Sequence, residues 1–223
     1  MTSDIPERAL HILQTVFGYP AFRGQQAEIV EHVAGGGDAL VLMPTGGGKS
    51  LCYQIPALLR DGVGVVVSPL IALMQDQVDA LEEVGVRAAF LNSTQTFEET
   101  LRIERLVRTG ELDLVYVAPE RLLTQRCLEL FDASPIALFA IDEAHCVSQW
   151  GHDFRPAYLE MAGAIEALDR PPVLALTATA DAHTRADILE QLGISREGLI
   201  VSGFDRPNIR YAITPRDNTT RQI

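Results

Sequence analysis

Residues 39–51, with the sequence ALVLMPTGGGKSL, constrain the fold of this chain more than any other stretch. The apolar run 39–43 predicts a short buried strand, and a helix can begin at Leu51. Three consecutive glycines, 46–48, stand between them, and glycine lets backbone N–H groups approach phosphate oxygens closely. The free N–H groups and the dipole of a helix start also attract anions. The order strand, glycine-rich loop, helix therefore predicts a phosphate-binding loop.

The residues around the glycines fit the same prediction. Lys49 is the single lysine among 18 basic residues, and its ammonium group stands where it would reach the β- and γ-phosphates of a nucleotide. The Ser50 hydroxyl is the expected magnesium ligand. Met43 departs from the usual pattern, which has Gly or Ala at that position. The alternative is a glycine-rich surface turn with an incidental lysine, and the strand and helix on either side argue against it. The expected phosphate-binding residues are Thr45, Gly46, Gly47, Gly48, Lys49 and Ser50.

Composition limits the classes of protein that this chain can belong to. A length of 223 residues fits one large domain or two small ones. The net charge of −12 argues against a general nucleic-acid coat, so any contact with nucleic acid is expected on a restricted surface. Three scattered cysteines, Cys52, Cys127 and Cys146, predict reduced thiols and neither a zinc site nor a disulfide framework. The sequence shows no signal peptide and no apolar run of roughly 18 residues, so we expect a location in a bacterial-type cytosol or nucleoid, away from membranes.

The rest of the chain alternates between apolar strands and helices. Further strands are expected at 63–68, 87–91, 112–117, 136–141, 173–177 and 199–201. Helices are expected at 6–17, after 26, after 51, and at 70–84, 96–109, 119–130, 156–168 and 181–192. Nearly continuous apolar strands separated by helices predict an α/β fold with a mostly parallel sheet, covered by helices on both faces in three αβα layers.

An acidic pair follows the apolar stretch 136–141, and in a doubly wound sheet ligands bind at such strand ends. Asp142 is suited to holding Mg²⁺, either directly or through water. Glu143 is suited to orienting or deprotonating an attacking water. The alternative, an acidic surface turn, does not explain why the pair comes directly after a buried strand.

Two later segments leave alternatives open. Thr177 and Thr179 end another apolar strand, and they either cap the following helix or hydrogen-bond the 142–145 segment and relay the nucleotide state. The loop 148–158 holds the only tryptophan, Trp150, together with Phe154. These aromatic side chains either stack on unpaired bases or fill the core beneath the loop. The other histidines, His11, His32 and His183, are interpreted as structural or solvent-facing.

Together these motifs resemble the RecQ DNA helicases of superfamily 2, in which the run from DEAH to FRP is specific. The matching segments are FRGQQ (22–26), MPTGGGKS (43–50), SPLIALMQDQV (68–78), LNSTQT (91–96), YVAPERL (116–122), DEAHCVSQWGHDFRP (142–156), LTATA (176–180) and FDRPNIRY (204–211). The resemblance implies an ATP- and Mg²⁺-dependent motor that moves 3′ to 5′ on single-stranded DNA, unwinds duplexes, and serves DNA repair and recombination.

The resemblance also implies roles for individual residues. Tyr19, Arg23 and Gln26 would contact adenine. Lys49, Asp142, Glu143 and His145 would form the catalytic set, with Ser50 and Asp142 as magnesium ligands and His145 coupling the site to DNA. The DNA-sensing loop would present Gln149, Trp150, His152, Phe154 and Arg155.

Helicases of this type have two RecA-like lobes with ATP between them. The resemblance implies that residues 1–207 form the first lobe and that 208–223 begin the connection to a second lobe, which the sequence does not contain. An arginine finger from a second lobe typically raises the rate 10³- to 10⁵-fold. We therefore expect this lobe alone to bind ATP–Mg²⁺, to hydrolyse it very slowly, to bind DNA weakly and not to unwind. The alternatives are a DExH-type RNA helicase lobe and a nucleotide-binding interaction module without turnover.

Overall fold

The sheet at the centre of the molecule has seven parallel strands in the order β3-β4-β2-β5-β6-β1-β7 within the described part of the chain. The computed structural model describes residues 4–151 and 153–203. The strands are β1 Ala39–Leu42, β2 Val63–Val67, β3 Ala88–Leu91, β4 Leu114–Val117, β5 Ile136–Ile141, β6 Val173–Thr177 and β7 Leu199–Val201. The α/β prediction with a parallel sheet is confirmed, and the proposed domain boundary at 207/208 lies outside the described residues.

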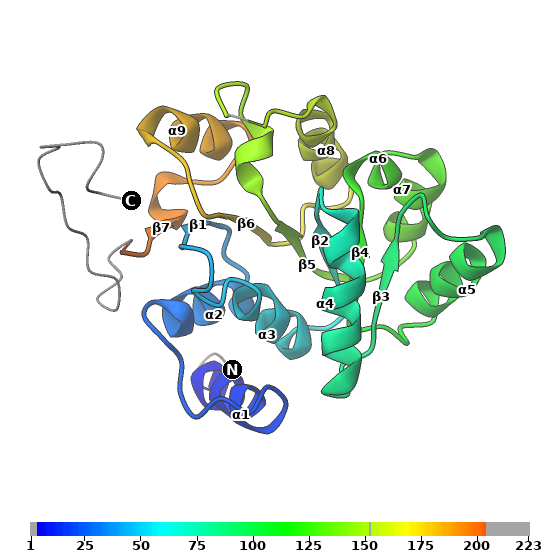
Figure 1. Ribbon diagram of the computed structural model, residues 1–223, viewed down its shortest axis with the longest axis horizontal. Helices are drawn as coiled ribbons and strands as arrows, with labels where there is room; N and C mark the ends of the chain where they lie inside the picture. The colour runs from blue at the N-terminus through cyan, green and yellow to red at the C-terminus, as the bar shows by residue number, and fades with distance from the viewer. Residues whose placement is uncertain (1–3, 152, 204–223) are drawn as a thin grey trace, which may run out of the picture.

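Helices cover both faces of the sheet (Figure 1). They are α1 Ile5–Thr15, α2 Gln26–Ala34, α3 Leu51–Leu59, α4 Ile71–Glu83, α5 Phe97–Arg108, α6 Pro119–Leu122, α7 Gln125–Asp132, α8 Pro156–Ala167 and α9 Ala182–Gln191, with short 3₁₀ turns η2 Ala144–Val147 and η3 Arg196–Gly198. One face packs against α2, α3 and α4, and the other against α5, α7, α8 and α9. The helix α1 lies outside α2 and α3 and packs on them.

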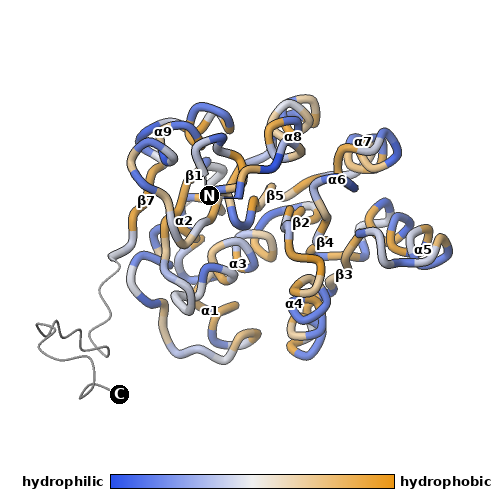
Figure 2. Tube along the Cα trace, turned by 45° about the horizontal axis from the view of Figure 1, so that its top comes forward, coloured by the Kyte–Doolittle hydropathy of each residue, from blue (hydrophilic) through white to orange (hydrophobic). Residues whose placement is uncertain are grey.

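The inner strands are almost entirely apolar because both of their faces are buried. In β1, Leu40 and Leu42 belong to one core, and Ala39 and Val41 to the other. Burying such a side chain fully contributes about 1.5–3 kcal/mol, so an unbroken apolar run is what this position in the fold requires. In Figure 2 the strands are largely orange, whereas the surrounding helices alternate between orange and blue.

The helix predicted over 119–130 is wrong as a single element. It divides into α6 and α7, because Thr124 adopts an extended backbone conformation and its side chain accepts a hydrogen bond from the Cys127 N–H. Threonine at this position caps the start of a new helix. No described helix combines the length and the apolar character that a membrane crossing requires.

Candidate active site

The glycine-rich loop joins β1 to α3 and requires its glycines for steric reasons. Gly46 and Gly48 have φ values of +81° and +77°, which side chains other than glycine rarely adopt. A Cβ on Gly47 would stand 2.6 Å from Cγ of Met43, so the large residue at position 43 fills space that a small residue would leave open. The backbone of the loop is therefore bare where a phosphate group would approach, which fits the predicted ligand.

The two polar residues that end the loop are placed for different tasks. The Lys49 Nζ donates a hydrogen bond to the Met43 carbonyl oxygen at 3.2 Å, which holds the ammonium group across the mouth of the loop. Ser50 precedes α3 with helical backbone angles, and its side chain makes no capping hydrogen bond. Its hydroxyl is therefore not occupied by the N–H groups of the helix it precedes.

The residues predicted to contact adenine gather beside the loop. Tyr19, Arg23 and Gln26 line a hollow of about 100 Å³ together with the three loop glycines. The Arg23 guanidinium lies 5.9 Å from the centroid of the Tyr19 ring, and this tyrosine is exposed.

Gln26 is already engaged with the protein. Its amide nitrogen lies 3.2 Å from the carbonyl oxygens of Gly47 and Gly48, and its amide oxygen accepts from the Arg23 N–H at 2.8 Å. The side chain is buried, so the structure gives it a role in holding the loop. A direct contact between Gln26 and adenine stays a prediction.

The acidic pair stands at the end of β5, one strand away from the end of β1. The strand β6 lies between them, pairing Thr177 with Leu42 on one side and Ala175 with Ile141 on the other. Two strand spacings amount to roughly 10 Å, a gap that suits a phosphate group and a metal ion. The loop and the acidic pair therefore lie at the same edge of the sheet.

The turn at the acidic pair is strained. Glu143 has a φ of 51° and a ψ of 46°, in the left-handed region that glutamate rarely adopts. Its backbone N–H donates to the Asp142 Oδ1 at 3.0 Å. Both residues of the pair are half-buried.

Several groups act on the pKa of Asp142. Burial is the largest effect and raises the pKa of Asp142, and the charge of Glu143 raises it further. The Glu143 N–H, Lys49 and His145 lower the same pKa. The ammonium group of Lys49 is thus close enough to act on this carboxylate.

His145 connects the acidic pair with β6. Its Nδ1 lies 3.1 Å from the Thr177 Oγ1 and 3.3 Å from the Glu143 Oε2. The Thr177 Oγ1 also lies 3.1 Å from the Thr179 carbonyl oxygen. Asp181 caps α9 instead, accepting from the Thr184 N–H at 2.8 Å. Of the two interpretations of Thr177, the hydrogen bond to the 142–145 segment is confirmed.

The aromatic-rich loop after η2 lies on α9. Ser148 is buried and donates a hydrogen bond to the Asp187 Oδ2 at 2.6 Å. The Trp150 side chain is 68% exposed, and its ring lies 4.9 Å from that of His183, with a tilt of 30° between the rings. A Cβ on Gly151 would overlap the His145 carbonyl oxygen, so this glycine is needed for the close approach of the loop to η2.

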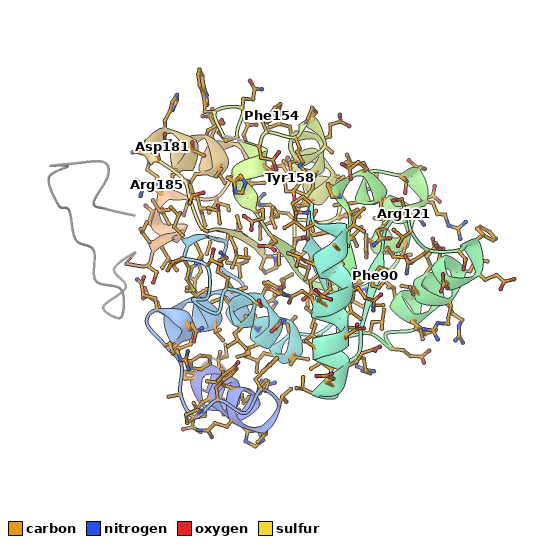
Figure 3. The ribbon with its side chains drawn as sticks, viewed as in Figure 1. Phe90, Arg121, Phe154, Tyr158, Asp181 and Arg185 are labelled. Carbon is orange, nitrogen blue, oxygen red and sulfur yellow. The ribbon has the colours of Figure 1, made fainter. Side chains whose placement is uncertain are left out.

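The other residues predicted for this loop are placed less uniformly. Gln149 is exposed, Phe154 is half-buried, and Arg155 pairs with Asp153 at 3.3 Å. In Figure 3, Phe154 lies in the loop between η2 and α8, above the buried Tyr158. His152 lies outside the described residues. The interpretation of Trp150 as a core residue is wrong, because most of its side chain faces solvent.

Several residues of the site had no individual role in the sequence interpretation. His183 was interpreted as structural or solvent-facing, yet it stacks on Trp150. Tyr158 donates its hydroxyl to the Asp142 carbonyl oxygen at 3.2 Å. Tyr53 and Tyr116 lie behind Ser50, with their hydroxyl oxygens 3.2 Å apart. Of these residues, only Tyr53 could have been linked to the site from the sequence, because it follows Ser50 by three residues and therefore lies on the same face of the helix.

The three cysteines, Cys52, Cys127 and Cys146, are free and buried. Ligand atoms of His145, Cys146 and Asp153 lie within 4.8 Å of one another. Burial raises the pKa of the Cys146 thiol to about 12, whereas a metal ligand must be a thiolate.

Comparisons with known proteins place this chain in a family. The family model for DEAD/DEAH box helicases matches residues 23–188. The ATP-dependent DNA helicase RecQ of Haemophilus influenzae is 48% identical over 215 residues, covering 96% of this chain and 35% of the relative. The RecQ of Bacillus subtilis is 44% identical over 218 residues, covering 97% and 37%. The chain thus spans little more than a third of the length of these curated relatives.

Solved structures confirm the fold prediction. The helicase domain of Hef from Pyrococcus furiosus matches with a TM-score of 0.63 and 19% identity, over 83% of this chain and 38% of that one. A hypothetical ATP-dependent RNA helicase from Sulfolobus tokodaii matches with a TM-score of 0.64 and 19% identity, over 90% and 57%. At this identity the likeness concerns the fold alone, a helicase lobe of the RecA-like type. The resemblance to RecQ helicases rests on the sequence identities above, and since the family model matches most of its length, this chain belongs to the DEAD/DEAH box helicase family.

Proposed function

We propose that this chain is the ATP-binding first motor lobe of a RecQ-like 3′–5′ DNA helicase. The observation that carries the proposal is the convergence of Lys49 and Asp142 on one site, across the single strand β6. A glycine-rich loop that only binds phosphate does not need an acidic pair facing it. The similarity to proteins named ATP-dependent DNA helicases supports ATP as the nucleotide and DNA as the nucleic acid.

The residues of the site divide the work by position. The bare backbone of Gly46 to Gly48 and the Lys49 ammonium would hold the phosphates, and Ser50 and Asp142 would hold Mg²⁺. A bound Mg²⁺ supplies charge neutralisation for the transferred phosphoryl group. Glu143, whose side chain is 28% exposed, would orient or deprotonate the attacking water. Tyr19 and Arg23 would hold the base beside the loop.

A route from nucleotide to nucleic acid runs through His145. This side chain contacts Glu143 and Thr177, and it lies in the turn that leads directly into the loop carrying Trp150. The exposed indole offers a stacking surface for an unpaired base, worth about 1–3 kcal/mol. A change in the position of Glu143 would therefore change the position of Trp150 through His145.

We infer that the lobe alone hydrolyses ATP very slowly, because an arginine finger from a second lobe is typically worth 10³- to 10⁵-fold in rate. The proposal predicts ATP–Mg²⁺ binding, weak single-strand binding and no unwinding by this chain. A DNA-stimulated turnover of many ATP per second by the chain alone would contradict it.

The test is nucleotide trapping by Glu143→Gln. If Glu143 is catalytic, this variant binds ATP like the wild type and releases no phosphate in a single-turnover assay, whereas the wild type releases phosphate slowly. Glu98→Gln, an exposed substitution on α5, serves as the control. A module that only binds nucleotide would show no phosphate release in either protein. Stimulation by RNA and not by DNA, in a protein with both lobes, would favour the RNA helicase alternative.

A further inference from the structure

Two buried tyrosines lie directly behind the predicted magnesium ligand Ser50. Tyr53 belongs to α3 and Tyr116 to β4, and their side chains are 3% and 2% exposed. Their hydroxyl oxygens are 3.2 Å apart, and the rings meet edge to face with centroids separated by 6.4 Å. This pair lies on the face of the sheet that packs against α3.

Packing alone does not explain why these two buried positions are tyrosine and not phenylalanine. Phenylalanine would fill nearly the same volume, and burying a hydroxyl costs free energy unless it is hydrogen-bonded. The two hydroxyls satisfy each other at 3.2 Å, and Ser50 beside Tyr53 and Gln54 beside Tyr116 are close enough to lower the pKa of these phenols through hydrogen bonding. The tyrosine pair therefore has the Ser50 hydroxyl on one side and Gln54, a residue of α3, on the other.

Asp142, the second predicted magnesium ligand, lies near the same tyrosine pair. In the register of the sheet, Tyr116 stands opposite Val66, and Val66 stands opposite Ala140. Asp142 follows Ala140 by two residues, so strand alternation directs it to the same face as Tyr116. Burial raises the pKa of both phenols, and the negative charge of Asp142 raises them further. The tyrosine pair thus stands next to both oxygen ligands.

We propose that Tyr53 and Tyr116 are positioning residues that fix the Ser50 hydroxyl for Mg²⁺. Tyr53 holds the serine side chain in one rotamer, and Tyr116 holds Tyr53. Because Ser50 makes no capping hydrogen bond, this phenol is the group that decides where its hydroxyl points. The partners of a metal ligand typically change metal affinity about 10- to 100-fold when they are removed. This inference rests on the proposed function, in which Ser50 binds the metal.

The test compares nucleotide binding in excess Mg²⁺ with binding in EDTA, using a fluorescent ATP analogue and the variants Tyr53→Phe and Tyr116→Phe. We expect the gain in affinity from Mg²⁺ to fall about tenfold in Tyr53→Phe and less in Tyr116→Phe. Affinity in EDTA should stay within about twofold of the wild type, because phosphate and base contacts are unaffected. Ser134→Ala, which removes a buried hydroxyl bonded to the Leu130 carbonyl oxygen, is the matched control and should keep the full gain.

A rescue variant separates positioning from packing. Ser50→Thr keeps the hydroxyl and stiffens its rotamer, because β-branched side chains have restricted χ1. In this background, Tyr53→Phe should lose less of the Mg²⁺ gain than it does with serine. An unchanged Mg²⁺ gain in both phenylalanine variants, or equal losses with and without Mg²⁺, would overturn the inference. Absence of any Mg²⁺ gain in the wild type would instead contradict the proposed function.

Discussion

Lys49 lies in the loop after β1 and Asp142 directly follows β5, and although these strands are not neighbours, the charge of Lys49 lowers the pKa of Asp142 against the larger, opposite effect of burial. The sheet order β5-β6-β1 brings them to the same edge. A cation and a carboxylate held one strand apart leave room for a group that interacts with both, and a magnesium-bound phosphate is such a group.

Replacement of Lys49 by alanine should weaken nucleotide binding roughly 10- to 100-fold, because hydrogen bonds to charged groups contribute about 1.5–3 kcal/mol. The measurement is a titration with a fluorescent ATP analogue. Arg108→Ala, on the exposed side of α5, is the control for loss of one positive charge. Lys49 also carries the only side-chain amine in the sequence, so ATP should protect the chain against side-chain acetylation by an amine-reactive reagent. Equal labelling with and without ATP would place the nucleotide elsewhere.

Asp142→Asn should make the chain more stable at neutral pH while weakening Mg²⁺-dependent nucleotide binding. Burial raises the folded-state pKa of Asp142, so the folded protein binds this proton more tightly than the unfolded chain does. The stability that Asp142 contributes is therefore lost as the pH rises from the pKa of the unfolded chain to the higher pKa of the folded protein. The difference between Asn and Asp should disappear in acid, below the ordinary pKa of aspartate of about 3.9. Thermal unfolding at neutral and acidic pH tests this, and an Asn variant less stable at neutral pH would contradict it.

Trp150 is the only tryptophan, so intrinsic fluorescence reports on the aromatic-rich loop alone. His183→Ala should change the emission of the free protein, because it removes the ring stacked 4.9 Å away. His11→Ala on α1 should leave the emission unchanged. Single-stranded DNA should change the emission of the wild type, and Trp150→Ala should weaken DNA binding by about 1–3 kcal/mol. If neither His183→Ala nor single-stranded DNA changes the Trp150 emission, the Trp150–His183 stack does not form in solution and Trp150 does not bind DNA.

The sequence was sufficient for the parts of the site that are local. Residues 39–51 contain strand, loop and helix in one run, and Asp142 follows its strand directly, so apolar patterning alone places both at strand ends. It was insufficient where the contact joins distant positions. The Tyr53–Tyr116 bond and the Trp150–His183 stack depend on which strands and helices become neighbours. The break between α6 and α7 was missed because apolar periodicity continues across Thr124, and only its capping hydrogen bond reveals the boundary.

Glu104 is buried in α5 and forms ion pairs with Arg121 of α6 and Arg126 of α7. Its Oε1 lies 3.1 Å from Arg121 Nη2, and its Oε2 lies 2.6 Å from Arg126 Nη2. The arginines are partly exposed and can return to water, whereas the carboxylate is 1% exposed and depends on them. Glu104→Gln should therefore lower the free energy of unfolding by about 1–3 kcal/mol, the usual cost of disrupting a buried hydrogen-bonded group.

Urea denaturation measures this difference, and Arg126→Ala should cost at least as much as Glu104→Gln, because it leaves the buried charge of Glu104 paired with Arg121 alone. Nucleotide affinity should be unchanged in both variants, since none of these three residues lines the nucleotide site. A loss of stability from Arg126→Ala that is clearly smaller than the loss from Glu104→Gln would show that the buried carboxylate does not depend on Arg126.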